Sequence, residues 1–281
     1  MIRHLRLTVL ADNSVAAPDL IAEHGFSLLI EADGRRILFD TGQGKVLRSN
    51  AKALGVSIAG LDALVLSHGH FDHTGGLAAL PEDDGPRAVF VHPGALQSKF
   101  AKNDVPPHRS IGMPEPSRRA LNRLWNRIVW TDAPTEVSLG VWCTGEIPRL
   151  APDEGSPATF FCNQDCTKTD STPDDQALFI ETQDGLVVIV GCAHSGVVNT
   201  LNRVGTLTKQ TDVLALIGGF HLGRASHKQL EECANAIGRR GCQFLAPCHC
   251  TGMSAHFYLR SRFHSLVQDV GVGTRLILGH Q

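Results

Sequence analysis

The chain has 281 residues, of which 42% are hydrophobic, and its 26 Lys and Arg residues nearly balance its 28 Asp and Glu. Because these charges form no block of one sign, the sequence argues against a nucleic-acid groove, which needs a concentrated cationic surface. No apolar run approaches the roughly 18 residues of a membrane span, and the first residues lack the apolar core of a secretion signal.

Five apolar segments are predicted as strands, and each one stops at a polar side chain. In chain order they are residues 35–42 with Asp40 near the end, 61–68 ending at His68, 185–194 ending at His194, 212–221 ending at His221 and 243–249 ending at His249. Continuous runs rich in Val, Ile and Leu are typical of strands buried on both faces. Helix character follows at 75–80, 197–207 and 226–240. The alternation predicts an α/β chain whose ligands gather beyond the carboxyl ends of the strands.

The middle of the chain is rich in proline. Most of the prolines lie between Pro81 and Pro173, and residues 103–117 alone carry four of them. Proline suppresses helix interiors and central strands, so we predict ordered loops over much of 100–120 and 148–176. Long loops inside a domain are often lids or binding loops, and a tolerated insertion is the alternative. We expect one domain over residues 1–281, with a loop or lid region at about 100–176.

The strongest chemical signal is the segment from Ser67 to His73. In extended backbone, residues two apart point the same way, so His68 and His70 can face one partner. Asp72 and His73 follow in a turn loosened by glycines. Four ligand-type side chains at the end of a buried strand need a partner that satisfies all of them, and a divalent metal does so. Zinc suits such a histidine-rich set best, while iron or manganese are also compatible.

This H-x-H-x-D-H pattern resembles that of the metallo-β-lactamase superfamily, whose members have an αββα sandwich with one or two metals at the sheet edges. The resemblance implies that His68 and His70 hold a first metal, and that Asp72 and His73 hold a second. It also matches Asp40 to an aspartate that orients the ligands through hydrogen bonds. An ordinary turn aspartate is the alternative for Asp40.

The likeness is stronger to one group within that superfamily. The matching segments are 39–42, 65–77, 144–149, 191–196, 217–222 and 246–252. They resemble the dihydropterin-ribofuranosylaminobenzene-phosphate synthases, a group also described simply as metal-dependent hydrolases. The match spans about residues 35–275, and it is specific for the fold and the metal site rather than for the substrate.

Two metals need further protein ligands, for which we choose His194 and His249. Each closes a buried strand beside small residues that let the backbone approach the site. A hydrogen-bonded core histidine is the alternative for both. His221 has the same setting, and we favour a role in which it faces the substrate over a role as a further ligand or a structural residue.

One position departs from the family pattern. Many members supply a bridging aspartate in a Gly-Asp pair, whereas here Gly191 is followed by Cys192. Either a solvent hydroxide alone bridges the metals, or the second site is weak, or Cys192 contributes a thiolate. If Cys192 does not bind a metal, we expect it to contact the residues that do. The number of metals is therefore left open.

The eight cysteines lie in the C-terminal half of the chain. Without an export signal, free or metal-bound thiols in a reducing cytoplasm are expected rather than disulfides. Neither Cys248-His249-Cys250 nor the pair Cys162 and Cys166 offers the four ligands of a structural zinc site, so free thiols are favoured.

Glu146 and Arg149 lie at the rim of the proline-rich region, where the arginine could bind a phosphate or carboxylate of the substrate. A surface ion pair is the alternative. No Ser/His/Asp triad in a strand–elbow setting, phosphate-binding loop or dinucleotide fingerprint is present.

The expected function is that of a metal-dependent hydrolase acting on a small, phosphorylated or ester-type molecule through a metal-bound hydroxide. Asp72 would align the water, and His221 would stabilise negative charge. The resemblance offers an alternative, a transferase that joins a dihydropterin-methyl diphosphate to an aminobenzene ribofuranosyl phosphate and releases pyrophosphate. A non-catalytic metal-binding sensor is a third possibility. We expect a cytoplasmic protein with a small-molecule substrate, no nucleic acid and no membrane, and the sequence leaves its oligomeric state open.

Overall fold

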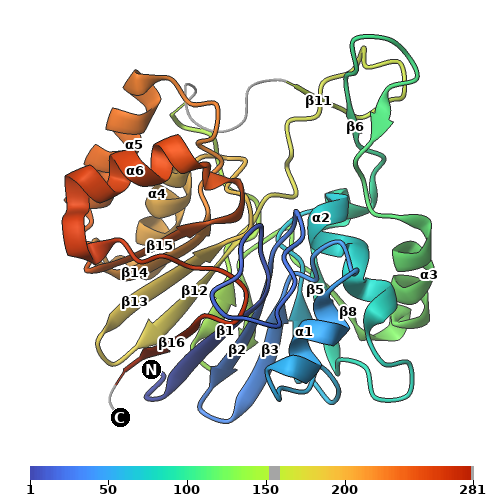
Figure 1. Ribbon diagram of the computed structural model, residues 1–281, viewed down its shortest axis with the longest axis horizontal. Coiled ribbons are helices and arrows are strands. Elements are labelled where there is room, and N and C mark those ends of the chain that lie inside the picture. Colours follow the sequence, from blue (N-terminus) through green and yellow to red (C-terminus); the bar gives the residue numbers. More distant parts are fainter. Residues whose placement is uncertain (152–158, 280–281) are drawn as a thin grey trace.

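The computed structural model describes residues 1–151 and 159–279 of the chain. Two large sheets lie face to face, with helices on the outer side of each (Figure 1). The first sheet contains, in spatial order, β16 (Arg275–Leu278), β1 (Leu5–Ala11), β2 (Ser27–Ala32), β3 (Arg35–Phe39), β4 (Ala63–Val65), β5 (Ala88–Val91) and β8 (Ile128–Trp130). The second contains β15 (Phe244–Cys248), β14 (Val213–Gly219), β13 (Gly185–Val190), β12 (Ala177–Thr182), β10 (Val141–Cys143) and β9 (Thr135–Ser138).

Helices cover the outer faces of both sheets. On the first sheet these are α1 (Leu47–Ala53), α2 (Phe71–Thr74) and α3 (Glu115–Arg123), and on the second α4 (Val197–Thr208), α5 (His227–Arg239) and α6 (Met253–Phe263). In the described residues, no helix combines the length and apolar character needed to cross a membrane. The predicted αββα sandwich is confirmed.

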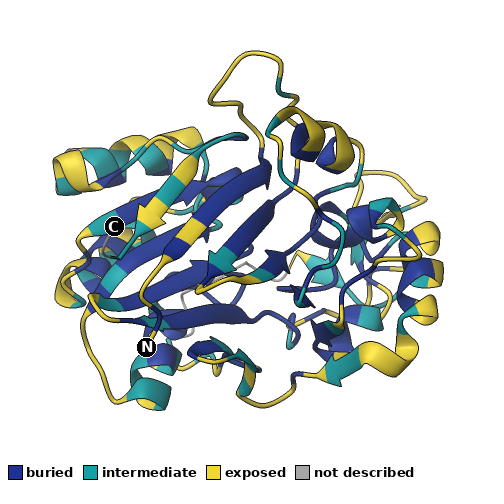
Figure 2. Cartoon of the chain, turned by 90° about the horizontal axis from the view of Figure 1, so that it is seen from below, coloured by how far each residue is buried: buried dark blue, intermediate teal, exposed yellow. Residues whose placement is uncertain are grey.

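Strand β13 shows why its sequence forms a doubly buried strand. Val187 and Ile189 pack into the core between the two sheets, whereas Val188 and Val190 pack against the helices on the outside. Because successive strand residues point to opposite faces, an unbroken apolar run is buried on both sides. Figure 2 shows the same pattern throughout the molecule, with buried strands inside and helices that expose one side.

All five predicted strands are present, and they are the strands β3, β4, β13, β14 and β15. The predicted helices at 197–207 and 226–240 correspond to α4 and α5, and α5 begins at a capping box formed by Ser226 and Gln229. Residues Gly75–Ala79 form a 3-10 turn rather than an α-helix.

The prediction of loops over 100–120 was wrong at its C-terminal end, where α3 begins. Pro114 is the N-cap of this helix, and Pro116 lies in its first turn. A proline fits there because the first backbone N–H groups of a helix have no intrahelical partner, and the fixed φ of proline suits the helix. A small third sheet also forms from β11 (Phe160–Phe161), β6 (Phe100–Ala101) and β7 (Arg109–Ser110). Part of the second predicted loop, residues 152–158, lies outside the described residues.

The parallel strands bring the polar strand ends together. Strands β3 and β4 are parallel neighbours in one sheet, and β13, β14 and β15 are parallel neighbours in the other. Their carboxyl ends lead into the segments that carry Asp40, His68, His194, His221 and His249. Ligand sites in sheets of this kind form beyond the carboxyl ends of the strands.

A buried ion-pair network supports the loops next to these strand ends. The side chain of Lys99 is only 1% exposed, and its Nζ lies 2.8 Å from Asp170 Oδ2 and 2.7 Å from Asp174 Oδ1. The other oxygen of Asp174 accepts a hydrogen bond of 2.7 Å from the backbone N–H of Gly69, between His68 and His70. The network therefore ties two distant loops to the H-x-H segment.

Replacing Lys99 with methionine is expected to lower the free energy of unfolding by roughly 3–5 kcal/mol, because it leaves two buried carboxylates without their cation. Urea unfolding of the variant measures this loss. The exposed Lys102, three residues away, provides the matched control, and Lys102→Met should change stability by no more than about 0.5 kcal/mol. Equal stabilities for the two variants would show that the network contributes nothing.

Candidate metal centre

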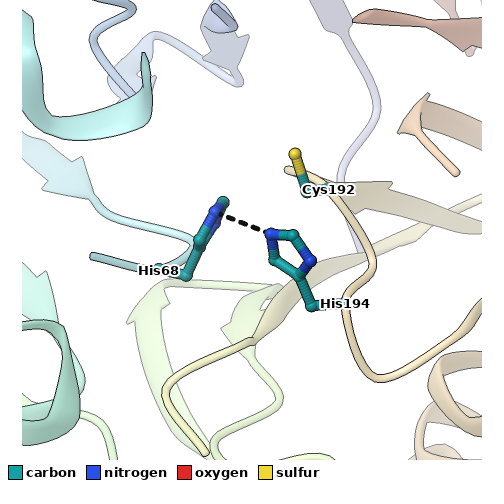
Figure 3. Close-up of side chains that lie close together, drawn as sticks. All are labelled: His68, Cys192 and His194. Carbon is teal, nitrogen blue, oxygen red and sulfur yellow. Dashed lines mark hydrogen bonds between the residues drawn. The ribbon is translucent and has the colours of Figure 1, made fainter. Parts of the chain in front are cut away.

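Three histidine nitrogens converge at the centre of the strand ends. His68 Nε2 lies 2.9 Å from His70 Nδ1, and His194 Nε2 lies 3.1 Å from each of them. His68 follows β4, His70 is the residue before α2, and His194 follows β13, so two sheets contribute to the cluster. All three rings are buried. Figure 3 shows His68 and His194 facing each other, with Cys192 beside them.

The hydrogen bonds behind His68 determine which of its nitrogens is free. Ser67 Oγ donates to Asp40 Oδ2 at 2.6 Å and therefore accepts from His68 Nδ1, 2.9 Å away. This network assigns the proton of His68 to Nδ1 and leaves the lone pair of Nε2 pointing into the cluster. Burial holds the pKa of His68 well below its usual value and lowers that of His70 to about 4. Neutral imidazoles that crowd together in this way fit a cation.

A second cluster forms around Asp72, His73 and His249. Asp72 Oδ2 lies 3.8 Å from His73 Nε2 and 3.5 Å from His249 Nε2. His73 Nδ1 donates to Asp40 Oδ2 at 2.6 Å, and His249 Nδ1 donates to Asn13 Oδ1 at 3.0 Å. In each ring the opposite nitrogen, Nε2, therefore faces Asp72. Within the described part of the chain, His249 Nε2 is buried and makes no hydrogen bond, as expected for a ligand atom.

The second cluster carries negative charge that would attract a cation. Burial opposes charge on the His73 ring, but Asp40 and Asp72 outweigh it and raise the pKa of His73 to about 9. Burial likewise disfavours ionised Asp72, yet the charge of His73 and the nearby rings of His24 and His249 hold the pKa of Asp72 well below the usual range. A proton on His73 Nε2 occupies the side of the ring that a metal would take, since both are cations held by the same carboxylates.

Left-handed backbone conformations mark the same strand ends. The non-glycine residues Asp40, Ala193, His221 and His249 have φ values of 58°, 47°, 50° and 49°. Such conformations cost of order 1–3 kcal/mol each and cluster at functional sites. They turn the chain sharply at the end of a strand and direct each polar side chain into the centre rather than along the sheet.

Gly191 is required because the two sheets come close together at this point. A Cβ at Gly191 would overlap Ser67 Oγ and approach Asp40 Oδ2 to 2.9 Å. Any larger residue would push the end of β13 away from β4. The glycine thus lets Cys192 and His194 reach the histidines that follow β4.

Asp40 connects the two clusters. Its carboxylate, fully buried, accepts hydrogen bonds from the backbone N–H of Ser67 at 2.7 Å, from Ser67 Oγ and from His73 Nδ1. One side chain therefore orients His68, through Ser67, and His73 directly. This placement agrees with the orienting role that the family resemblance implies for Asp40.

Of the three residues predicted to bind substrate, only His221 lies beside the histidine cluster described above. The His221 ring lies 4.5 Å from that of His194, and its Nδ1 makes no hydrogen bond among the described residues. Glu146 is exposed. Arg149 donates from Nη2 to the backbone oxygen of Ser171 at 2.8 Å and to Thr172 Oγ1 at 2.7 Å, so it braces a neighbouring loop.

Several residues of the centre were not predicted from the sequence. His24 Nε2 lies 3.2 Å from Asp72 Oδ2, and Asp12 Oδ1 accepts the backbone N–H of His249 at 2.9 Å. Asp12 and Asn13 directly follow the apolar strand β1. The pattern that predicted the other site residues, an apolar strand ending at a polar residue, therefore also applies to them. Asp175 accepts the backbone N–H of Ser195 at 2.7 Å, and burial raises its pKa to about 6. For His24, which precedes a strand, the sequence contains no comparable signal.

Known proteins resemble this chain in sequence and in fold. The sequence model of the metallo-beta-lactamase superfamily matches residues 20–142. The chain is 29% identical, over 86% of its length and 85% of the relative's, to the 7,8-dihydropterin-6-methyl-4-(beta-D-ribofuranosyl)-aminobenzene-5'-phosphate synthase of Methanocaldococcus jannaschii. It is 32% identical to an uncharacterized protein of the same organism, covering 89% of this chain and 91% of that protein.

A solved structure supports the same assignment. The crystal structure of a metal-dependent hydrolase of the beta-lactamase superfamily superimposes with a TM-score of 0.82 and 29% sequence identity, covering 99% of this chain and 100% of the other. The fold of the chain is thus that of a known family. This chain belongs to the metallo-β-lactamase superfamily.

Proposed function

We propose that the chain is a metal-dependent hydrolase that acts on a small phosphorylated or ester-type substrate at two adjacent metal subsites. The observation that carries the proposal is the convergence of six ligand atoms on two buried clusters. Subsite 1 comprises His68, His70 and His194, and subsite 2 comprises Asp72, His73 and His249. Buried imidazole and carboxylate groups in such number suit zinc best, and iron or manganese are compatible.

The residues around the subsites have distinct roles in this proposal. A divalent ion would supply a Lewis acid that lowers the pKa of a water and polarises the phosphoryl or carbonyl group of the substrate. Asp72, held ionised, would orient the attacking water through its carboxylate. His221, whose Nδ1 makes no hydrogen bond among the described residues, would donate to the negative oxygen of the substrate.

An aromatic side chain borders the first subsite. The ring of Phe160 in β11 lies 4.8 Å from the His70 ring, 5.3 Å from that of His194 and 6.4 Å from that of His221. Phe160 is only partly buried. This arrangement favours a substrate with an apolar or aromatic part next to the bond that is broken.

A transferase is the second candidate, and the likeness to the methanogen synthase favours it. In this case the two subsites would bind the diphosphate of a dihydropterin-methyl substrate. Departure of pyrophosphate would then be coupled to attack by an aminobenzene ribofuranosyl phosphate. The same ligands would serve either reaction, because each builds negative charge on the leaving oxygen or on an oxygen of the group that is attacked.

Removing and restoring the metal tests the enzymatic proposal. We expect chelator-treated protein to lose turnover of phosphoesters, lactones or thioesters, and added zinc to restore it, because the histidine clusters require a cation. Pyrophosphate release that depends on the arylamine would instead favour the transferase. Protein that binds metal but turns over none of these substrates would contradict both reactions and indicate a sensor.

A further inference from the structure

We infer that the sulfur of Cys192 is a thiolate ligand shared by the two metal subsites. This inference rests on the proposed function, since it requires both subsites to bind metal. It identifies the protein group that stands between the metals, at a position where many superfamily members carry an aspartate.

The sulfur lies next to ligand atoms of both subsites. Cys192 Sγ is 3.1 Å from His73 Nε2, a ligand atom of subsite 2. The same sulfur and one ring nitrogen each of His73 and His249 all lie within 4.8 Å of one another. The sulfur and one ring nitrogen each of His68 and His194, in subsite 1, satisfy the same limit. One buried atom therefore belongs to both groups.

These separations are compatible with metal coordination. With zinc–nitrogen distances of about 2.0–2.1 Å and zinc–sulfur distances of about 2.3 Å, two donors on one tetrahedral zinc lie roughly 3.3–3.6 Å apart. The contact between His73 Nε2 and Cys192 Sγ is slightly shorter than this range, and the His68–His194 contact of 3.1 Å is similar. Outward movements of a few tenths of an ångström would bring both separations into this range.

The position of the Cys192 sulfur bears on the three ways in which the two metal subsites could be joined: a solvent bridge, a weak second subsite or a thiolate ligand. If solvent alone bridged the metals, the sulfur would not need to lie close to histidine nitrogens of both subsites. Cys192 is 3% exposed, and Gly191 allows the close approach of its strand to Ser67. A weak second subsite is disfavoured because His73, His249 and Asp72 are all buried and already oriented. A thiolate ligand accounts for the position of the sulfur directly.

A sulfur ligand has a consequence for the choice of metal. Thiolates select zinc, cobalt and related thiophilic ions, whereas carboxylates at the same position suit manganese or magnesium better. The centre is thus expected to prefer zinc more strongly than one bridged by aspartate. The variant Cys192→Asp should retain both subsites while losing this preference.

Cys250 provides a matched control. Its Sγ forms a hydrogen bond of 3.7 Å to the backbone oxygen of Cys192, and it groups with Cys192 and His221 rather than with the ligands of either subsite. It is the same type of residue in the same neighbourhood. Replacing it with serine tests whether any nearby thiol, rather than Cys192 itself, produces the expected signal.

The test is optical and uses the full chain loaded with Co²⁺, with metal content measured in parallel. We expect two cobalt ions per chain and a near-ultraviolet sulfur-to-cobalt charge-transfer band that is present in the wild type and in Cys250→Ser. The band should be absent from Cys192→Ser and Cys192→Asp. Zinc affinity should fall by at least about 10-fold in Cys192→Ser, and Cys192→Asp should shift the preference from zinc towards manganese.

The outcomes separate this inference from the proposed function. Two bound cobalt ions without a charge-transfer band in the wild type would overturn the thiolate ligand and leave the two subsites intact. A band that persists in Cys192→Ser but disappears in Cys250→Ser would assign the ligand to Cys250 and overturn the inference. A wild-type chain that binds no metal would overturn the inference together with the proposed function. If Cys192→Ser fails to fold, the folded Cys192→Asp variant decides the same question through its spectrum.

Discussion

His194→Ala is expected to remove bound metal and catalytic turnover together. His194 Nε2 lies 3.1 Å from both His68 Nε2 and His70 Nδ1, so its loss leaves subsite 1 with two of its three histidine ligands. Replacing residues that only support a metal ligand typically costs about 10–100-fold in metal affinity or activity. Removing a ligand should cost more than this range. Elemental analysis of protein purified without added metal, combined with an activity assay, measures both effects.

A surface histidine is the control for this experiment. His4 is exposed and lies just before β1, so His4→Ala should retain the wild-type metal content. Circular dichroism would verify that both variants are folded. If His194→Ala bound as much metal as His4→Ala, His194 would have no role as a ligand, and the first subsite would have to be redefined.

Asp40→Asn is expected to weaken metal binding at both subsites, although Asp40 need not touch either metal. Its carboxylate accepts hydrogen bonds from Ser67 and from His73. An amide keeps only one accepting atom and turns an NH₂ group towards the other donors, so the protons of His68 and His73 are no longer held on Nδ1. We expect metal affinity to fall by about 10–100-fold and the free energy of unfolding by roughly 1–3 kcal/mol.

Competition with a chelating dye measures the affinity, and urea unfolding measures the stability. Asp62→Asn is the matched control. Asp62 also accepts a backbone N–H, that of Arg36, but it lies just before β4, at the end of the strand opposite the metal subsites. Its metal affinity should equal that of the wild type. Wild-type affinity in Asp40→Asn would contradict the orienting role, while a loss of stability alone would limit Asp40 to a structural role.

The sequence identified the elements of the centre that depend on local pattern. Apolar runs that stop at a polar residue predicted the strands carrying Asp40, His68, His194, His221 and His249, and the structure brings all five to one end of the sandwich. The reason is physical: a doubly buried strand must be apolar throughout, so its first polar residue marks the point where the chain leaves the core. The fold class followed from the same alternation and from the family resemblance.

Contacts between distant segments were not predictable in this way. Proline density predicted a loop where α3 begins, because the same residue that breaks a helix interior also favours its first turn. His24 contacts Asp72 across 48 positions of the chain, and Lys99 pairs with Asp174 across 75. The residues next to each partner in the sequence contain no pattern that predicts these pairs.

The local pattern of the sequence was enough to predict that buried strands end at histidines and at one aspartate, and it shows Cys192 directly after Gly191. It left three possibilities for how the two subsites are joined. Which atoms face each other depends on the folded chain, because the two sheets meet through the packing of side chains that lie far apart in the sequence. That packing puts the sulfur of Cys192 3.1 Å from His73 Nε2 and close to the ligands of the other subsite.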